Sequence, residues 1–308
     1  MIIRTYHPSD AAAVTALLEA AAAQDRTRHV SPGNFQKTWE AYSPDPTQPR
    51  YDESAIVTDG SGAVYGFAWW SVDAPGNLGL EGWVHPHQRR RGVGTALLTA
   101  TEHYAEQYLH GTVTLSARAY ADIPGVERLF SLKGYAQSHP WYVMRSRLQN
   151  RHLAADLPAG ISVKIFNAGQ LEQLVDADNT IFHDHWGAKQ RTPSLFRAQM
   201  IEMRPHDPKL WLLAWAGDEL VGECLCHPNH LGEPNDGWVS TLGVRREYRG
   251  RGLGRALLVM GLQRLQDRGF DTASLSVDSE NISAVNLYRS VGMDVLRTRL
   301  SFEKHITV

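Results

Sequence analysis

The alternation of apolar and polar positions predicts a definite order of strands and helices, most clearly in the second half of the chain. A short strand near 161–166 leads to a helix whose apolar residues recur at the helical period, namely Leu171, Leu174, Val175 and Phe182. A hairpin follows, with strands over 210–216 and 220–226 and the turn Gly217-Asp218-Glu219 between them. This half therefore begins as strand, helix and hairpin.

A strand over 238–244 then runs into a glycine-rich loop and a helix from about 255 to 268. The helix turns four leucines to one side, and Gly269 is expected to end it; the leucines are Leu257, Leu258, Leu262 and Leu265. The last three elements expected are a strand over 273–277, a helix over 283–291 and a strand near 295–302. The pattern predicts a mixed α/β fold around one sheet.

The first half repeats the landmarks of the second in the same order. The matching positions are Ile3-Arg4 with Val163-Lys164, Gly66 with Gly222, Gly92 with Gly252, and Gly134 with Gly292. Their separations are 160, 156, 160 and 158 residues, so nearly one spacing relates the two halves. A repeat of this kind indicates an internal duplication, with the small differences expected in loops.

The duplication suggests two domains, as the length of 308 residues also does. The stretch 148–160 is polar, contains alanine and proline, and shows no periodicity, which is typical of a linker. We therefore expect an N-terminal domain over 1–147, a linker over 148–160 and a C-terminal domain over 161–308.

The glycine-rich loop of the second half is Arg249-Gly250-Arg251-Gly252-Leu253-Gly254, where a helix begins. Backbone N–H groups at a helix N-terminus bind anions, glycines let a ligand approach closely, and arginines supply donors to phosphate oxygens. Taken alone, such a loop is more often a helix cap with solvated arginines. It lacks the G-K-[ST] of a P-loop, and neither half has a Rossmann fingerprint with its later acidic residue, so those two phosphate sites are excluded.

The first half carries the counterpart loop Arg89-Arg90-Arg91-Gly92-Val93-Gly94. In both halves the pattern R/Q-x-x-G-x-G/A follows a strand and opens a helix, and it resembles the coenzyme A pyrophosphate loop of the GNAT N-acetyltransferases. The matching order of elements extends the resemblance over nearly all of both halves. It implies two tandem GNAT-like domains, each a mostly antiparallel mixed sheet flanked by helices, with acetyl-CoA as co-substrate. The tandem arrangement is similar to that of the mycothiol synthases.

The resemblance also implies which residues hold the coenzyme. The strand before the second loop is expected to be splayed, with backbone groups of Leu242 and Val244 facing the acetyl carbonyl and the pantetheine arm. The coenzyme positions expected in the second half are Leu242, Val244, Arg249, Gly250, Arg251, Gly252, Leu253, Gly254, Arg255 and Asn281. Those in the first half are Val84, Arg89, Arg90, Arg91, Gly92, Val93, Gly94 and Thr95.

Members of this family commonly protonate the departing sulfur with a tyrosine that lies four residues before a late glycine. In the second half this residue is Tyr288, before Gly292. A phenol has a pKa of about 10 and so keeps its proton at neutral pH, although an aromatic residue in a helix is otherwise expected to pack inward. Asn281 is expected to contact the coenzyme or to anchor the turn before this helix.

The first half departs from this pattern at both positions. Phe130 lies four residues before its glycine, and Ile123 lies where the second half has Asn281. Phenylalanine has no proton to donate. We therefore expect the first domain to be a coenzyme-binding or structural partner and the second to be the catalyst.

The general base is less defined than the acid. Mycothiol synthases carry a glutamate six residues before the position of Val244, whereas this chain has Trp238, which weighs against mycothiol synthesis itself. Asp236 and Glu223 are the nearest carboxylates, and removal of the proton by water is an equal alternative. Each carboxylate alone would more often be a solvated surface group.

The acceptor is expected beside His183, Asp184, His185 and Trp186, which follow the first helix of the second half. Histidine titrates near neutrality and tryptophan can form an apolar wall, although a helix end with a buried tryptophan explains the segment equally well. The segment Cys224-Leu225-Cys226-His227 does not have the spacing of a zinc site, so no metal is expected.

Composition narrows the remaining possibilities. The formal net charge of −2 gives no general attraction for nucleic acid, and the run Arg89-Arg90-Arg91 lacks aromatic platforms around it. No apolar stretch reaches the length of a membrane span, no signal peptide is evident, and only two cysteines occur, so a cytoplasmic location is expected without nucleic-acid or membrane partners. The oligomeric state stays open.

The leading functional prediction is transfer of an acetyl group to a primary amine of a small molecule, by direct attack in a ternary complex. The alternatives are acetylation of a cysteinyl amino sugar, as in mycothiol synthesis, and a catalytically silent module that binds coenzyme A.

Overall fold

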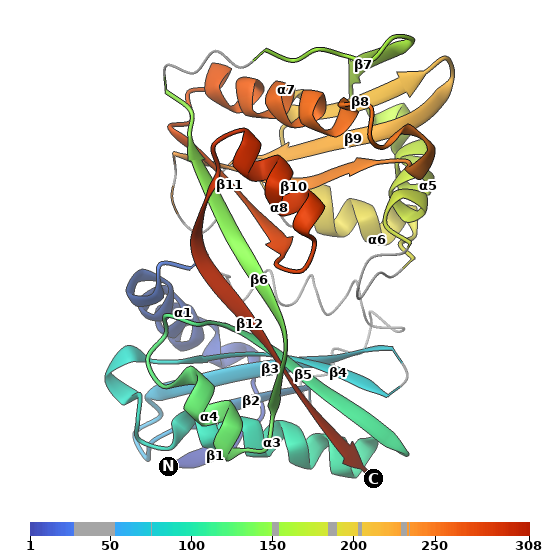
Figure 1. The fold of residues 1–308 in the computed structure, drawn as a ribbon. Helices are drawn as coiled ribbons and strands as arrows, with labels where there is room; N and C mark the ends of the chain where they lie inside the picture. The colour runs from blue at the N-terminus through green and yellow to red at the C-terminus, as the bar shows by residue number, and fades with distance from the viewer. Residues whose placement is uncertain are drawn as a thin grey trace. The chain divides into compact units, whose positions relative to one another are not determined.

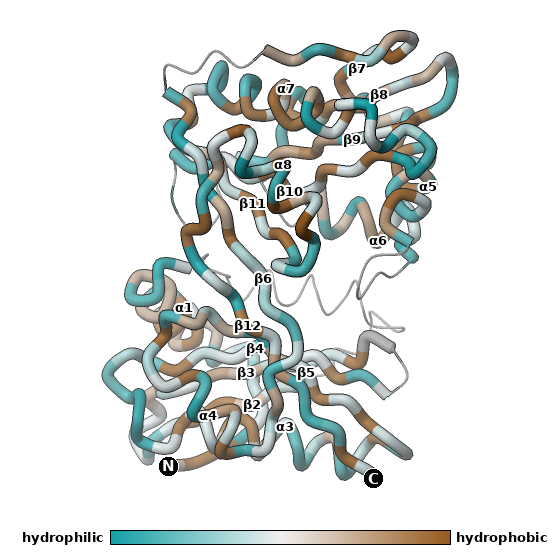
Figure 2. The backbone as a smooth tube through the Cα atoms, in the orientation of Figure 1, coloured by the Kyte–Doolittle hydropathy of each residue, from teal (hydrophilic) through white to brown (hydrophobic). Residues whose placement is uncertain are grey.

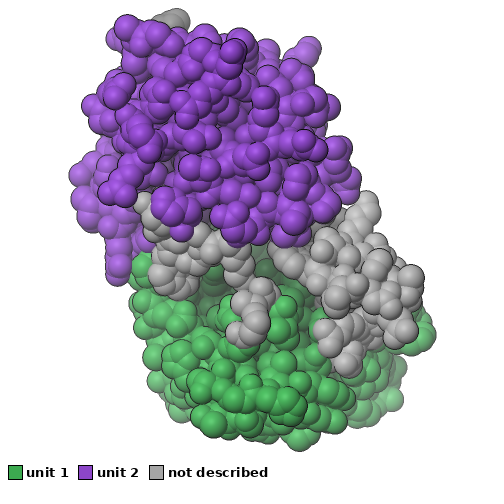
Figure 3. Space-filling model, turned by 90° about the vertical axis from the view of Figure 1, so that its right-hand side faces the viewer, with its two compact units in different colours: residues 1–142, 297–308 green, residues 143–296 purple. Residues whose placement is uncertain are grey.

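The computed structural model describes residues 1–27, 53–74, 76–149, 154–183, 190–202, 205–228, 233 and 235–308. Its contacts divide the chain into two compact units (Figures 1 and 3). Unit 1 consists of Met1–Tyr142 and Arg297–Val308, and unit 2 consists of Val143–Leu296. Among the described residues, no helix combines the length and apolar character needed to cross a lipid bilayer.

Unit 1 is a mixed sheet with helices on its faces (Figure 1). Its strands are β1 (Ile2–Arg4), β2 (Ser54–Thr58), β3 (Val64–Ala74), β4 (Asn77–Val84), β5 (Thr112–Tyr120) and the first part of β6 (Ala136–Arg147). Its helices are α1 (Ala11–Asp25), α3 (Val93–Tyr108) and α4 (Val126–Leu132). The strand order is β1-β2-β3-β4-β5-β12-β6, in which β4 and β5 are parallel and the other pairs with a recorded register are antiparallel.

Unit 2 has the same arrangement. Its strands are β7 (Ile161–Ile165), β8 (Trp211–Ala216), β9 (Glu219–His227), β10 (Asp236–Val244), β11 (Thr272–Asp278) and the start of β12 (Asp294–Thr307). Its helices are α5 (Leu171–Ile181), α6 (Pro193–Arg197), α7 (Leu253–Asp267) and α8 (Ile282–Ser290). The order β6-β11-β10-β9-β8-β7 again contains one parallel pair, β10 with β11. The predicted mixed α/β fold and its tandem repetition are confirmed.

The units differ from the expected domain limits, 1–147 and 161–308, because two strands run from one unit into the other. The chain leaves unit 1 after Tyr142, inside β6, and the end of β12 belongs to unit 1. There Arg299–Thr307 pair antiparallel with Tyr120–Thr112 of β5. In the expected linker, Leu148 is buried and its N–H donates to the Asp271 carbonyl. Apolar alternation identifies a strand but not the sheet edge that it joins, so the sequence did not reveal this exchange.

Helix–sheet packing follows the predicted apolar stripes. The four leucines of α7 are buried, and Figure 2 shows apolar and polar positions alternating along this helix. Gly269 adopts a φ of 85° directly after the helix cap, as expected for a helix end. At Gly261 of α7, a Cβ would lie only 2.6 Å from the Cys224 Sγ atom, so this glycine lets the helix approach β9 closely.

Candidate active site

Strands β10 and β11 diverge part of the way along their length. Their parallel pairing runs from Asp236 opposite Thr272 to Val239 opposite Leu275 and ends there, although both strands continue. We call this divergence the splay of unit 2. Backbone groups of β10 beyond Val239 therefore have no partner on β11, which is the splaying expected before the glycine-rich loop.

A β-bulge in β10 coincides with the start of the splay. Val239 pairs with Cys226 and Thr241 pairs with Leu225 on β9, so Ser240 is an extra residue on β10. A bulge bends the strand and re-aims its backbone groups. Nothing in the sequence pattern indicated this residue.

The loop after β10 presents the beginning of a helix. Gly252 caps α7 with a φ of 84°, and Gly250 has a φ of 75°, a left-handed conformation that side-chain-bearing residues rarely adopt. The first helical hydrogen bond runs from the Ala256 N–H to the Gly252 carbonyl at 3.0 Å. The N–H groups of the first turn, at Leu253, Gly254 and Arg255, therefore lie at the positive end of the helix dipole, which favours an anion.

The arginines of the loop have different surroundings. Arg249 donates from Nε to the Val244 carbonyl at 2.9 Å and from Nη2 to the Ile181 carbonyl at 3.0 Å, so it braces the loop against the end of α5. Arg251 is exposed and lies over the Tyr248 ring, and Arg255 donates to the Ala154 carbonyl at 3.3 Å. Of these three arginines, Arg251 is the one whose guanidinium makes no hydrogen bond to the described residues.

Tyr288 lies on α8 and is 8% exposed. Burial raises the pKa of its phenol above its ordinary value, and the nearby Cys224 adds to this rise. The hydroxyl is therefore protonated throughout the neutral range. Its neighbour Leu287 lies 3.7 Å from where a Cβ on Gly254 would be, which brings α8 against the first turn of α7.

Asn281 caps α8. Its Oδ1 atom accepts a hydrogen bond from the Ala284 N–H at 3.1 Å, which is the anchoring role considered for it from the sequence. The cap fixes the first turn of the helix that carries Tyr288.

The two faces of the sheet in unit 2 have different neighbours. On β9, Cys224 points towards α7, because a Cβ on Gly261 of that helix would meet its sulfur. Glu223 points to the opposite face. It pairs with Gly243 of β10, and a Cβ on Gly243 would meet Ile181 of α5, so α5 covers the face on which Glu223 lies. Helix α8, which carries Tyr288, packs against the first turn of α7 through Leu287, so it lies on the α7 face.

Glu223 is completely buried on the α5 face. Burial raises the pKa of its carboxyl well above the ordinary value, the adjacent Asp178 raises it further, and Arg191 partly offsets the rise. Asp178 itself forms an ion pair with Arg191. Glu223 therefore holds a proton next to a carboxylate and is closed to solvent.

Asp236 lies at the paired end of β10, away from the splay. It is completely buried and accepts hydrogen bonds from Thr272, from Ser274 at 3.1 Å and from Arg145 at 3.2 Å. Burial raises the pKa of this carboxyl, while Thr272 and Arg145 lower it. Its contacts are those of a structural network, and neither carboxylate considered from the sequence is presented to solvent.

The expected acceptor segment is only partly described. The His183 Nδ1 atom contacts the Thr180 carbonyl at 2.9 Å, and Asp184, His185 and Trp186 lie outside the described residues. Asn179 of α5 forms two hydrogen bonds with the backbone of Arg191. Its side-chain oxygen accepts from the Arg191 N–H at 2.8 Å, and its side-chain NH₂ donates to the Arg191 carbonyl at 2.9 Å. No local sequence pattern indicated these contacts.

Ser276 is a further polar residue that the sequence did not indicate. It follows Leu275, the last β11 residue paired with β10. Ser274, two residues earlier on β11, donates a hydrogen bond to Asp236 on the α5 face of the sheet. Because side chains two residues apart on a strand share a face, Ser276 also lies on the α5 face. Its hydroxyl is buried and has no hydrogen-bond partner among the described residues.

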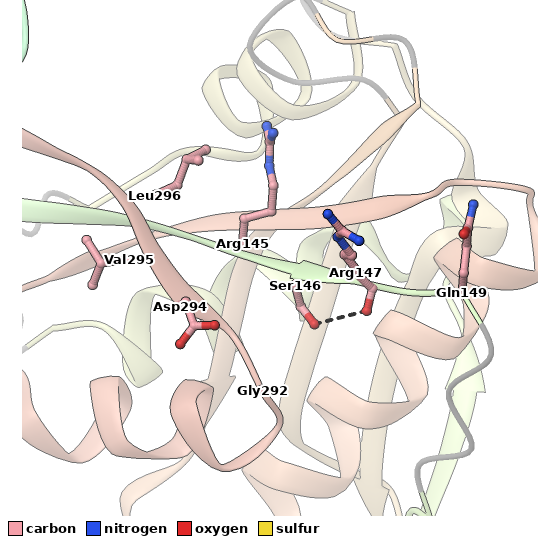
Figure 4. Close-up of a pocket in the computed structure, with 8 residues that line it drawn as sticks. All are labelled: Arg145, Ser146, Arg147, Gln149, Gly292, Asp294, Val295 and Leu296. Atoms are coloured by element: carbon pink, nitrogen blue, oxygen red, sulfur yellow. Dashed lines mark hydrogen bonds between the residues drawn. The ribbon is translucent and has the colours of Figure 1, made fainter.

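A pocket of about 470 Å³ lies elsewhere in unit 2 (Figure 4). Its lining consists of Arg145, Ser146, Arg147, Gln149, Gly292, Asp294, Val295 and Leu296, from β6 and from the turn and strand that follow α8. The Arg145 guanidinium is held by Asp236, Glu233 and Ser274. None of the residues predicted from the sequence lines this pocket.

Unit 1 repeats the backbone of the site. The pairing of β4 with β5 ends at Leu80 opposite Ala117, and Gly92 caps α3 with a φ of 85°. The first turn of α3 contains the expected positions Val93, Gly94 and Thr95. Arg89 pairs with Asp25 through both carboxylate oxygens, at 2.8 and 2.7 Å, and so braces the loop to α1 as Arg249 braces its own loop to α5.

The side chains of unit 1 differ from those of unit 2 at the chemical positions. Phe130 is buried and stacks on Phe302 with ring centroids 4.3 Å apart. Gly125, not an asparagine, caps α4, and the Arg90 guanidinium lies against it. Arg90 also has a φ of 63°, where unit 2 has Gly250. Unit 1 thus keeps the loop without the phenol and without the capping amide.

Comparisons with known proteins agree with this architecture. Residues 16–123 and 171–293 match the model of the acetyltransferase (GNAT) family. The chain is 32% identical to the mycothiol acetyltransferase of Geodermatophilus obscurus, over 92% of this chain and 91% of that protein. It is 33% identical to the mycothiol acetyltransferase of Thermobispora bispora, over 92% of each.

Solved structures give the same result. A GCN5-related N-acetyltransferase from Sphaerobacter thermophilus aligns with a TM-score of 0.75 and 27% identity, covering 100% of this chain and 97% of that one. A tandem GNAT protein from the clavulanic acid biosynthesis pathway aligns with a TM-score of 0.72 and 18% identity, over 99% and 97%, and shares the fold. The family model covers well over half of the chain, in one region of each half. This chain belongs to the GNAT family of acetyltransferases and is an acyltransferase with two tandem GNAT domains.

Proposed function

We propose that unit 2 transfers the acetyl group of acetyl-CoA to a primary amine of a small molecule, by direct attack in a ternary complex. The observation that carries this proposal is the combination of a splayed and bulged β10, an open helix N-terminus at Gly252 and a buried, protonated Tyr288. In this proposal 161–296 is the catalytic part and unit 1 does not catalyse.

The residues of unit 2 fit the parts of acetyl-CoA. The pyrophosphate is held by the N–H groups of the first turn of α7, with Arg251 at the rim, because this is where the backbone offers unpaired donors. The pantetheine arm and the thioester carbonyl use β10 backbone groups near Leu242 and Val244, which the splay leaves without a β11 partner.

The proposed reaction uses both faces of the sheet. The amine approaches from the α5 face, where Ser276 offers a hydroxyl, and Tyr288 approaches from the α7 face. The amine nitrogen bonds to the thioester carbon, the carbon–sulfur bond breaks, and Tyr288 gives its proton to the leaving thiolate. The excess proton of the amine passes to water and is returned through solvent to Tyr288, since Glu223 is buried with a raised pKa and Asp236 is buried and hydrogen-bonded.

The acceptor of mycothiol synthesis, a cysteinyl amino sugar, is the second candidate. It is favoured by the 32–33% identity to proteins named mycothiol acetyltransferase over most of the chain. Trp238, which stands where mycothiol synthases carry a glutamate, weighs against this acceptor, and the fully buried Glu223 is not presented to solvent as a substitute base.

The test is a panel of small primary amines, including a cysteinyl amino sugar, with acetyl-CoA and detection of the released thiol. We expect acetylation of at least one amine, with thiol release that depends on the amine. Thiol release at the same rate with and without every amine would contradict the proposal and favour a module that only binds coenzyme A.

A further inference from the structure

The face of unit 1 that α1 covers carries three polar side chains next to one another on β5 and β12. Ala117 and Leu300 belong to the core on the opposite face, so Arg118, Arg299 and Ser301 point to the α1 face by alternation. In the register of the two strands, Ser301 lies opposite Arg118. Arg299 is two positions away along β12, a diagonal neighbour on the same face.

None of these three groups has a partner among the described residues. Ser301 is 3% exposed, and its hydroxyl makes no hydrogen bond. The Nε atom of Arg299 is buried and likewise unpaired. Arg118 is exposed and forms no hydrogen bond or ion pair with the described part of the chain. Buried polar groups are nearly always hydrogen-bonded in native proteins, so the two buried unsatisfied groups, of Ser301 and Arg299, beside the exposed Arg118 indicate a ligand.

One acidic residue faces the two arginines. This residue is Glu81 of β4, which follows Leu80, the last residue paired with β5. Leu80 points into the core on the opposite face, so Glu81 points to the α1 face. Desolvation raises the pKa of its carboxyl, and the charges of Arg118 and Arg299 lower it. Desolvation and the like charge of Arg118 lower the pKa of the Arg299 guanidinium. Two cations facing one anion leave this patch positively charged.

A neighbouring arginine on the same strand, Arg297, has acceptors for its guanidinium N–H groups. Arg297, two residues before Arg299 on β12, contacts the Asp122 carboxylate at 2.6–3.2 Å and donates to the carbonyls of Asp25 and Arg26. Within the described part of the chain, Arg299 has no comparable hydrogen-bond acceptor.

The corresponding face of unit 2 is built differently. In unit 1 the pairing of β5 with β4 ends at Ala117, and in unit 2 the pairing of β11 with β10 ends at Leu275. The next residues, Arg118 and Ser276, therefore occupy corresponding positions. The arginine of that face, Arg145, contacts both Asp236 and Glu233. The cationic, unpaired arrangement is therefore specific to unit 1.

We infer that unit 1 binds a small oxyanion, the carboxylate or phosphate group of a small molecule, through the Arg118 and Arg299 guanidinium groups and the Ser301 hydroxyl. Planar guanidinium groups present paired donors that match both kinds of oxyanion, and the hydroxyl supplies a further donor. This binding function is separate from the acetyl transfer proposed for unit 2.

The test follows the arginine Nε–H signals of the full-length protein by ¹⁵N NMR during titration with inorganic phosphate or succinate, at an ionic strength held constant with chloride. The Arg299 signal is assigned by its loss in Arg299→Lys. We expect a saturable shift of this signal with at least one anion, and the better anion identifies the ligand class. The Arg297 signal, already paired with Asp122, should stay in place. Absence of a shift, or equal linear shifts of both signals, would overturn the inference.

A matched pair of exposed substitutions provides the second measurement. Arg118→Met should weaken anion binding at the Arg299 signal by about 10- to 100-fold, because one charge-assisted contact is lost. Arg128→Met, at an exposed position of α4, removes the same charge elsewhere in unit 1 and should leave the affinity unchanged. Equal weakening in both variants would show a general charge effect and also overturn the inference.

Discussion

Units 1 and 2 have nearly the same backbone at the glycine loop and different side chains around it. Gly92 and Gly252 cap their helices with φ values of 85° and 84°, and the first arginine of each loop braces it to the end of α1 or of α5. Yet Phe130 stands where Tyr288 stands. The two units therefore share the loop geometry, whereas the side chains at the proposed chemical positions differ between them.

The bulge of β10 accounts for part of the uneven spacing between the halves. Leu80 and Val239, the last residues paired with the following strand, are 159 positions apart, whereas Val84 and Val244 are 160 apart. The extra residue is Ser240. In unit 1, Leu80 and Glu81 of β4 pair with consecutive residues of β3, whereas in unit 2 Ser240 is left out of the pairing between β10 and β9. The insertion therefore lies inside a strand of unit 2, beside the proposed reaction centre.

The largest effect is expected from the residue that distinguishes the two units chemically. Tyr288→Phe should lower the turnover number by about 10²–10⁴-fold, the range typical of a general acid, because the ring stays and only the proton donor is lost. Acetyl-CoA affinity, measured by calorimetry, should stay within about 2-fold of the parent because the binding loop is untouched. Full turnover with the best amine would remove Tyr288 from the mechanism.

The two loops can be compared by the same substitution. Gly252→Val places a β-branched residue at a φ of 84°, which strains the loop and disrupts its N–H groups. Loss of two charge-assisted hydrogen bonds should weaken acetyl-CoA binding at unit 2 by about 100-fold or more. Gly92→Val should leave turnover largely intact.

Melting curves must accompany these kinetics, because either substitution can destabilise the fold. If Gly92→Val abolishes turnover in a protein as stable as the parent while Gly252→Val does not, the assignment of the two units is reversed.

The interior beneath α5 and α1 gives a third comparison. Asp178 and Glu223 meet in unit 2, and the matching positions of unit 1 are Leu18 and Phe67, which share one apolar core. The pKa of Glu223 is raised on folding, so its contribution to stability is present at acid pH and is lost as pH rises above the unfolded pKa.

Glu223→Gln should therefore flatten the pH dependence of the melting temperature between pH 5 and 9. A stability change of about 1 kcal/mol corresponds to about 2–4 °C for a domain of this size, which calorimetry resolves. Equal slopes for the parent and the variant would show that Glu223 is not protonated in the folded protein.

The sequence predicted the order of elements, the duplication and the family, because apolar periodicity and the glycine loop are local signals. It did not predict the exchange of β12, since pairing partners depend on tertiary structure. It named Asp236 and Glu223 as nearby carboxylates but could not show that both are buried, nor that Arg249 donates to the Ile181 carbonyl at the end of α5. Ser240, Ser276 and Arg191 have roles that depend on three-dimensional neighbours, so no local pattern marked them.

The smallest effect on turnover is expected from restoring the missing phenol in unit 1. Phe130→Tyr introduced into the Tyr288→Phe variant should not recover activity, because unit 1 also lacks the bulge of β10 and carries Arg118 where unit 2 has Ser276. The new hydroxyl would be buried against the rings of Phe302 and Tyr135, so it should cost about 1–3 kcal/mol of stability. Turnover of the double variant is compared with that of Tyr288→Phe alone at a temperature where both are folded. Recovery of amine-dependent thiol release would show that one hydroxyl separates the two units, and would contradict the proposal that unit 1 lacks the strand geometry and the face needed for catalysis.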